Sequence, residues 1–123
     1  TFDFNSEIDV VNGILPTGIR FGTDGALYAA DWINGWDAKN YGRVWKIDTK
    51  TPELVSERAE TKRLMALDYE SQTSDKLYSL LFNADMRIRQ KAQFALAAKN
   101  DSETLLKAVA QKENQLARIH GLW

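Results

Sequence analysis

Residues 16–31 read PTGIRFGTDGALYAAD, and this stretch decides the fold of the first half of the chain. Two short runs rich in β-forming residues, Gly18 to Phe21 and Ala26 to Ala30, flank the segment Gly22-Thr23-Asp24-Gly25. An Asp-Gly pair tolerates the positive φ angles of a tight turn, and glycine has no Cβ to oppose them. The pattern therefore predicts a β-hairpin.

A third run extends this hairpin. Residues 43–47, RVWKI, follow the loop 32–42 and alternate polar and apolar side chains, as in a half-buried strand. We therefore predict an antiparallel β meander within residues 1–50. Because a small sheet with two partly apolar faces cannot cover both of them, we expect this meander to be part of a larger domain.

The period of the hydrophobic pattern changes near residue 50. Thr51-Pro52-Glu53 offers an N-cap, a proline at the first helical position and an acid in the first turn. We predict a connecting helix or two within residues 51–73, and then helices over 75–82 and 84–99 capped by Ser74 and Asn83. The expected fold class is α+β, a meander followed by helical repeats.

An internal repeat appears in the helical half, residues 74–123. A shift of 29 positions superimposes pairs of matching side chains, namely Leu77 on Leu106, Asp85 on Asn114, Arg89 on Arg118, Ala92 on Gly121 and Phe94 on Trp123. A helix pair repeated at a fixed period is typical of an α-solenoid, in which each repeat packs on its neighbours. We expect two repeats, with the second one truncated.

Composition excludes several classes of site. Charges are balanced at 16 Lys and Arg against 17 Asp and Glu, and the basic residues are dispersed, so we expect no nucleic-acid binding. The chain has no cysteine and one histidine, His120, which excludes a thiolate zinc site, a covalently attached haem and a multi-histidine metal site within it. No stretch approaches the roughly 20 apolar residues of a membrane-spanning helix.

Both halves carry motifs that resemble known families. The helical pattern Asp85-x-x-Ile88-Arg89-x-x-Ala92-x-x-Ala95-Leu96 resembles the second helix of short HEAT repeats, in which an acid can pair with an arginine one turn later. The first half resembles a blade of NHL-type and sorbosone or glucose dehydrogenase-like propellers at Pro16, Gly18, Asp24, Gly25, Leu27, Tyr28 and Asp31. The order of the halves, with DW-x-x-GW at 31–36 and GRVWKI at 42–47, is similar to that of bacterial membrane-bound dehydrogenase-type proteins.

This resemblance implies a fragment that spans the propeller–HEAT junction of a periplasmic or otherwise extracytoplasmic sugar dehydrogenase-like oxidoreductase. Pyrroloquinoline quinone and, where the family carries a C-terminal CxxCH domain, c-type haem are the implied cofactors of the whole protein, with none held by this chain. The alternative is a non-catalytic scaffold whose propeller binds carbohydrate and whose helical repeats bind a protein. We expect the 123 residues alone not to be catalytic.

The candidate ligand residues cluster around one end of the hairpin, because an antiparallel pair brings Thr17 and Asp31 together. Asp31 could accept hydrogen bonds from sugar hydroxyls, and the neighbouring tryptophans could stack on a sugar ring. Arg20 could face an anionic ligand in a central channel. The substrate-binding candidates are thus Thr17, Arg20, Asp31, Trp32 and Trp36.

Each candidate also has a structural interpretation. Asp31 could instead hold its loop through backbone amides, the tryptophans could pack between sheets, and Arg20 could pair with an acid. Asp24 and Asp37 are too few for the oxygen cage of a calcium ion, and turn chemistry accounts for Asp24. We expect no metal site, and a packed or surface role for His120.

Overall fold

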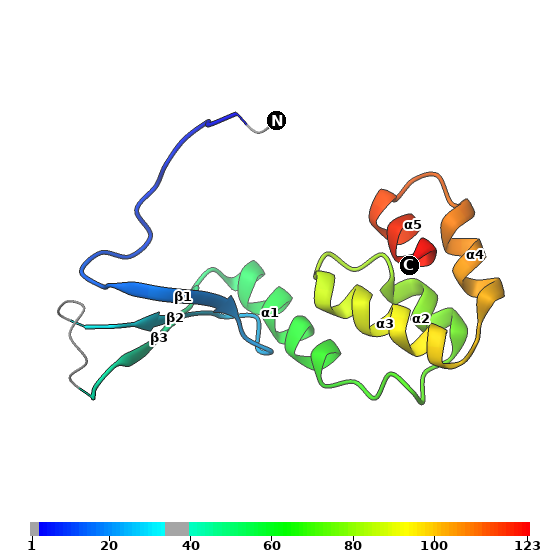
Figure 1. The fold of residues 1–123 in the computed structure, drawn as a ribbon, viewed down its shortest axis with the longest axis horizontal. Helices are drawn as coiled ribbons and strands as arrows, with labels where there is room; N and C mark the ends of the chain where they lie inside the picture. Colours follow the sequence, from blue (N-terminus) through cyan, green and yellow to red (C-terminus); the bar gives the residue numbers. More distant parts are fainter. Residues whose placement is uncertain (1–2, 34–39) are drawn as a thin grey trace.

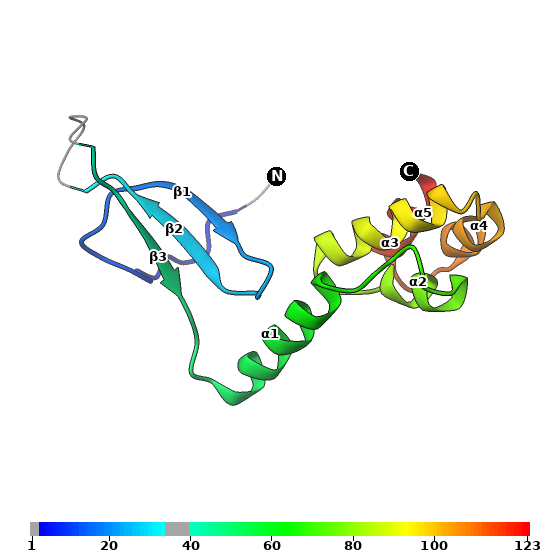
Figure 2. The same ribbon diagram turned by 90° about the horizontal axis from the view of Figure 1, so that it is seen from below.

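The computed structural model describes residues 3–33 and 40–123. Within them lie three strands and five helices, which confirms the expected α+β class. The strands are β1 (Pro16–Phe21), β2 (Leu27–Asp31) and β3 (Arg43–Ile47), and the helices are α1 (Pro52–Met65), α2 (Ser74–Leu80), α3 (Met86–Ala98), α4 (Ser102–Ala110) and α5 (Gln115–Leu122). The sheet lies at one end of the molecule, helices α2 to α5 lie together at the other end, and α1 runs between them (Figures 1 and 2).

The sheet is the predicted antiparallel meander, in the order β1-β2-β3. Its first turn closes through the amide of Gly25, which donates to the Gly22 carbonyl at 3.0 Å, and the amide of Gly22, which donates to the Ala26 carbonyl at 2.8 Å. Gly25 has a φ of +75°, which a residue with a Cβ rarely adopts. The Asp-Gly pair therefore forms the turn that the sequence predicts.

The register of the strands gives the sheet one apolar face. Directly opposite residues in an antiparallel pair share a face, so the pairings collect on one side Ile19, Phe21, Leu27, Ala29, Trp45 and Ile47. We call this set the apolar face. The opposite side carries Arg20, Tyr28, Val44 and Lys46. Much of the apolar face is open, since the side chains of Ile19 and Phe21 are 61% and 65% exposed.

Helix α1 begins as predicted, with Thr51 as N-cap and Pro52 in the first turn, and it is a single helix that ends at Met65. The main core lies beyond it, where α2 and α3 pack against each other and against α4 and α5. The largest fully buried side chains there are Leu77, Leu81, Ile88 and Leu96. None of the helices within residues 3–33 and 40–123 has the length and apolar character needed to cross a membrane.

Two of the expected caps are wrong by one or two positions. Thr73, not Ser74, caps α2, because its hydroxyl oxygen accepts from the amide of Lys76. Asp85, not Asn83, caps α3, while the Asn83 amide oxygen accepts from the amide of Asp85 one turn earlier. Several neighbouring residues here can cap a helix. Which of them does so depends on the backbone conformation, which the sequence alone does not reveal.

The expected pairing of Asp85 with Arg89 is also wrong. The Asp85 carboxylate pairs with Arg87, at 2.6 Å to Nη2 and 3.0 Å to Nε. Arg89 is buried instead, and its Nη1 donates to the carbonyls of Asn83 and Ala84 at 2.7 and 2.8 Å. These carbonyls lie in the turn before α3. Arg89 therefore stabilises that turn and does not form an ion pair with Asp85.

The helices form two consecutive pairs, α2 with α3 and α4 with α5. Their second helices follow the predicted shift of 29 positions, because Asp85 caps α3 and Asn114 caps α5. Their first helices are 28 positions apart, since Thr73 caps α2 and Asp101 caps α4. The second pair is therefore one residue longer from cap to cap, because α4 has nine residues where α2 has seven and the turn after α4 is shorter by one. Leu105 rather than the exposed Leu106 thus corresponds to the buried Leu77.

Candidate functional site

Asp31 is the centre of a hydrogen-bond network at one end of the sheet. Its Oδ1 accepts from the amides of Leu15 and Ile33, both at 3.0 Å. Its Oδ2 accepts from Trp45 Nε1 at 2.9 Å and forms an ion pair with Arg43 at 3.1 Å. The Trp45 indole, with the Leu15 and Ile33 amides and the Arg43 charge, lowers the pKa of Asp31 to about 2.

A carboxylate offers about four acceptor positions, and the four protein partners of Asp31 occupy them. The side chain has no exposed surface. Asp31 therefore joins three segments of the chain, the residues before β1, the end of β2 and the start of β3. These contacts are the ones expected if Asp31 has a structural role, in which its carboxylate holds the loop through backbone amides.

Thr17 and Trp32 lie at the same end of the sheet as Asp31, as the hairpin predicts. Thr17 is exposed, and its hydroxyl donates to the Ala30 carbonyl at 3.4 Å. The Trp32 amide donates to the Leu15 carbonyl at 3.0 Å, and its side chain is 38% exposed. Trp36, the remaining predicted substrate-binding residue, lies outside the described residues.

Two aromatic residues that sequence reasoning missed lie near this end, at Tyr41 and Trp45. Both are exposed, at 50% and 39%, and the Arg43 guanidinium lies 4.9 Å from the centre of the Trp45 ring. Thr17, Trp32, Tyr41 and Trp45 thus lie at or near the same end of the sheet, and we call these four residues the aromatic rim. The alternation in residues 43–47 could have identified Trp45, because it places this residue on the same face as Ile47.

Arg20 does not belong to the aromatic rim. It lies near the other end of β1, opposite Tyr28 and on the face away from Asp31. It borders a shallow hollow shared with Ile19 and Met86. Within residues 3–33 and 40–123 no carboxylate forms an ion pair with it, so the expected pairing with an acid is not found there.

Asp24 organises the turn at that other end of the sheet. Its Oδ1 accepts from the Ala26 amide at 3.1 Å, while Oδ2 accepts from Lys46 Nζ at 2.6 Å and from the Tyr28 hydroxyl at 3.1 Å. The Lys46 ammonium, followed by the Ala26 amide, lowers the pKa of Asp24 well below its usual range. In the part of the chain that the structure describes, no three His, Asp or Glu side chains are placed to hold a metal ion.

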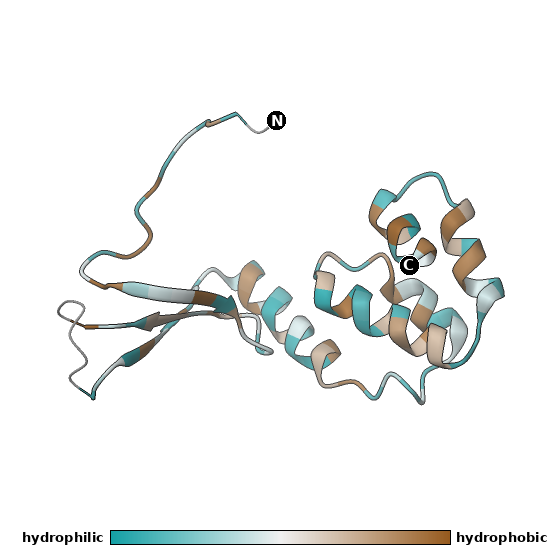
Figure 3. Ribbon diagram, in the orientation of Figure 1, coloured by the Kyte–Doolittle hydropathy of each residue, from teal (hydrophilic) through white to brown (hydrophobic). Residues whose placement is uncertain are grey.

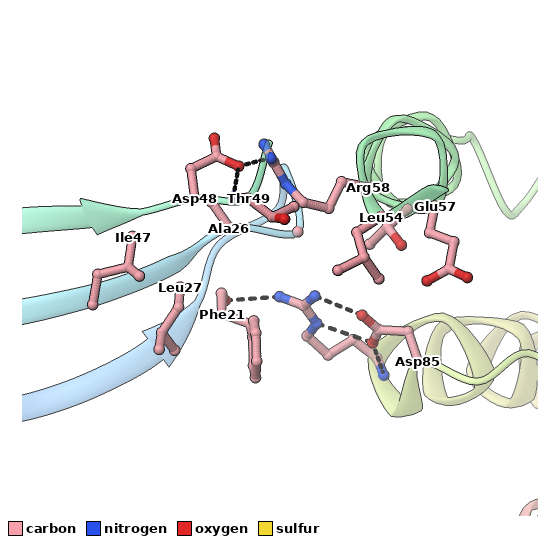
Figure 4. Close-up of a pocket in the computed structure, with 13 residues that line it drawn as sticks. Phe21, Ala26, Leu27, Ile47, Asp48, Thr49, Leu54, Glu57, Arg58 and Asp85 are labelled. Atoms are coloured by element: carbon pink, nitrogen blue, oxygen red, sulfur yellow. Dashed lines mark hydrogen bonds and ion pairs between the residues drawn. The ribbon is translucent and has the colours of Figure 1, made fainter. Parts of the chain in front are cut away.

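A pocket of about 460 Å³ opens where the sheet, α1 and the start of α3 meet (Figure 4). Its walls are largely apolar and include Phe21 and Leu27 from the sheet and Leu54 from α1. Two ion pairs border it, Asp48 with Arg58 and Asp85 with Arg87. Because its lining comes from separate segments, no local sequence pattern predicts this pocket.

Arg87 connects the two halves of the chain at this pocket. Its Nη1 donates to the carbonyls of Phe21 and Gly22 at 2.7 and 2.9 Å, and its Nε and Nη2 donate to Asp85. One planar guanidinium thus bonds to the end of β1 and to the cap of α3 together. The Arg87 fork is also the main cause that lowers the pKa of Asp85.

A second connection runs from α1 to the end of the sheet. Arg58 of α1 pairs with Asp48, the residue after β3, and its side chain lies against Gly25 in the first turn. A Cβ added to Gly25 would lie 3.1 Å from Arg58 Cγ and 3.3 Å from its Cα. Gly25 therefore permits both the positive φ of the turn and the close approach of α1.

His120 is a buried structural residue on α5. Its Nδ1 lies 2.7 Å from Gln93 Oε1 on α3, which is the distance of a direct hydrogen bond. Burial, and then the nearby Arg89 charge, lower the pKa of His120 below its ordinary value. The neutral ring therefore bonds α5 to α3, as the expected packed role implies.

Comparisons of the chain with protein-family models, with curated proteins and with solved structures found no match.

Proposed function

We propose that this chain is a connecting scaffold, which fixes a propeller-blade-type sheet against HEAT-type helical repeats within a sugar dehydrogenase-like oxidoreductase. The observation that carries the proposal is the bonding of Arg87 to both halves. Its guanidinium donates to two carbonyls at the end of β1 and to the carboxylate that caps α3.

The arrangement of donors explains why this contact would hold an orientation and not merely a distance. An arginine fork presents its N–H groups in one plane, so satisfying carbonyls on one side and a carboxylate on the other restricts rotation as well as separation. Hydrogen bonds to charged groups contribute roughly 1.5–3 kcal/mol. The Arg58–Asp48 pair gives a second point of attachment, and two separate attachments resist twisting better than one.

The oxidoreductase part of the proposal is supported by the sequence resemblance and by the order of sheet and helices. Under this proposal the longer protein is periplasmic and uses pyrroloquinoline quinone and c-type haem. Sugar-dependent dye reduction by that protein, with and without added quinone, tests this part. Absence of turnover with sugars, polyols and sugar aldehydes would leave the connecting role standing alone.

A second candidate function is carbohydrate binding at the aromatic rim. The favouring observation is that Trp32, Tyr41 and Trp45 are all exposed toward the end of the sheet that holds Asp31, and exposed aromatic rings can stack on sugars. Titration of tryptophan fluorescence with sugars tests it, using Trp32→Ala as the variant. Trp123→Ala, which removes an exposed ring at the far end of the chain, is the matched control.

The connecting role predicts that sheet and helices unfold together. Urea unfolding would be followed through the NMR signal of the Trp45 indole N–H for the sheet, and through circular dichroism at 222 nm for the helices. We expect coincident transitions in the native chain and separated transitions in Arg87→Ala, with Lys112→Ala as an exposed control. Separate transitions already present in the native chain would refute the connecting role.

A further inference from the structure

The segment before β1 has the pattern of a strand but lies in none of the described strands. Between residues 3 and 11, the apolar side chains of Phe4, Ile8 and Val10 alternate with the acidic ones of Asp3, Glu7 and Asp9. Figure 3 shows this alternation of hydrophobic and hydrophilic residues along the extended segment. Phe4, Ile8 and Val10 are 82%, 82% and 76% exposed, which leaves one apolar side of the segment in water. We call residues 3–11 the arm.

An open strand edge exists to receive such a segment. In the order β1-β2-β3, strand β3 has β2 on one side and, among the described residues, no strand on the other. The outer edge of β1 is less open, because the Phe21 carbonyl there accepts from Arg87. An unpaired edge offers a row of backbone N–H and C=O groups to an incoming strand.

The two sides of the arm match the two sides of the sheet at β3. On the apolar face, β3 presents Trp45 and Ile47, which suit the arm's apolar side, together with Arg43, which is paired with Asp31. On the opposite face it presents Val44 and Lys46, so the acids of the arm would lie beside a cation that Asp24 already binds. A shift by one residue would turn Phe4, Ile8 and Val10 away from Trp45 and Ile47, so burial of apolar side chains favours only one of the two orientations of the arm.

The attachment of the arm favours pairing between molecules. Leu15 is held at the start of β1, where its amide donates to Asp31 and its carbonyl accepts from the Trp32 amide. Strand β1 is the opposite side of the sheet from β3, and the chain before β1 rises from one face of the sheet and does not run along its edge (Figures 1 and 2). We propose that the arm of one copy adds as a fourth strand to β3 of a second copy of this chain.

Cysteine cross-linking tests the proposal cleanly, because the chain has no native cysteine. Glu7→Cys is placed on the arm of one sample, and Val44→Cys, at a 72% exposed position of β3, on another carrying a size tag. After mixing and oxidation we expect a disulfide between the two samples to form about tenfold faster than between Glu7→Cys and Lys112→Cys, since pairing raises the effective thiol concentration. Equal rates for the two mixtures would overturn the proposal.

The double variant Glu7→Cys/Val44→Cys distinguishes pairing of the arm with its own sheet from pairing with the sheet of a second copy. At high dilution, a disulfide inside one molecule would show that the arm folds back on its own sheet, and would refute the exchange between copies.

Sedimentation gives an independent readout: the native chain should self-associate, and Phe4→Ser/Ile8→Ser/Val10→Ser should be monomeric. The control Asn5→Ser/Ser6→Asn keeps every apolar residue of the arm and should associate like the native chain; a monomeric native chain at all concentrations would contradict the proposal.

Discussion

Arg87 donates a hydrogen bond to the carbonyl of Phe21 at 2.7 Å, although 66 positions separate the two residues. This contact joins the end of the first strand to the start of the central helix of the helical half. It depends on the shape of the guanidinium, because the same group also holds Asp85 through two other nitrogens.

Replacing Arg87 by lysine should therefore weaken the junction even though the charge is kept. A lysine ammonium is a single point and cannot reach two carbonyls and a carboxylate in the same plane. We expect Arg87→Lys to lower the free energy of unfolding by about 1–3 kcal/mol, as measured by urea denaturation. Arg63→Lys is the matched control, because Arg63 forms the same kind of fork on Glu60 at an exposed site and should cause no measurable loss. Equal effects of the two variants would show that the Arg87 geometry does not matter.

Asp31→Asn should loosen the end of the sheet, since an amide offers one oxygen where the carboxylate offers two. The Trp45 indole N–H or the two backbone amides would then lose their acceptor, and the Arg43 ion pair would be lost. We expect a lower melting temperature and an upfield shift of the Trp45 indole proton in NMR spectra. Asp75→Asn, on an exposed residue, is the control.

The same carboxylate gives a pH dependence with a defined sign. The pKa of Asp31 is lower in the folded chain than its ordinary value of 3.8, so the folded state binds fewer protons in this range. The stability it contributes is fully present above 3.8 and should be lost as the pH falls from there toward about 2. A Trp45 indole signal that already shifts between pH 6 and pH 5 would contradict this assignment.

Gly121→Ala should disturb the packing of α5 on α4. A Cβ at this position would lie 2.8 Å from the Leu105 carbonyl oxygen and 3.1 Å from Ala108 Cβ, so the two helices must separate slightly. We expect a loss of about 1–3 kcal/mol in the free energy of unfolding. Gly18→Ala is the control, because an added Cβ there meets no atom within 4 Å. A loss with Gly18→Ala as large as with Gly121→Ala would contradict the packing explanation.

Protonation of His120 should destabilise the contact of α5 with α3. Its pKa is lower in the folded chain than its ordinary value of 6.5, so stability should fall as the pH decreases below that value. The cause is the cost of placing a cation in a buried site near Arg89. We expect His120→Gln to reduce the slope of unfolding free energy against pH between pH 7 and pH 5. An unchanged slope would assign this dependence to other groups.

Local patterns predicted most of the elements of the fold. The alternation in residues 16–31 and 43–47 gave the meander, and Thr51-Pro52-Glu53 gave the start of α1, because both depend on residues close in sequence. The caps of α2 and α3 were misplaced, since Thr73, Ser74, Asn83 and Asp85 all have side chains that can cap a helix. The constant shift of 29 failed for α2 and α4, because α4 is two residues longer than α2 while the turn after it is one residue shorter, and such small changes leave no hydrophobic pattern of their own.

The site was harder to predict than the fold. The hairpin correctly brought Thr17 beside Asp31, yet it did not show that four protein groups would occupy the Asp31 carboxylate. One of those groups, Trp45 Nε1, comes from a strand that lies 14 positions further along the chain. Likewise, nothing near Arg87 in sequence indicates that it bonds to β1, because that contact depends on how α1 places the helical half.

The distance between a spin label on the sheet and one on the helical half tests the connecting role most directly. Labels at Val44→Cys in β3 and Lys112→Cys after α4 occupy exposed sites in a chain without other cysteines. In a sample diluted with excess unlabelled chain, so that only distances within one molecule are measured, the connecting role predicts a single narrow distance distribution in the native chain and a clearly broader one when Arg87→Ala is added. A broad distribution in the native chain, or one that Arg87→Ala leaves unchanged, would contradict it.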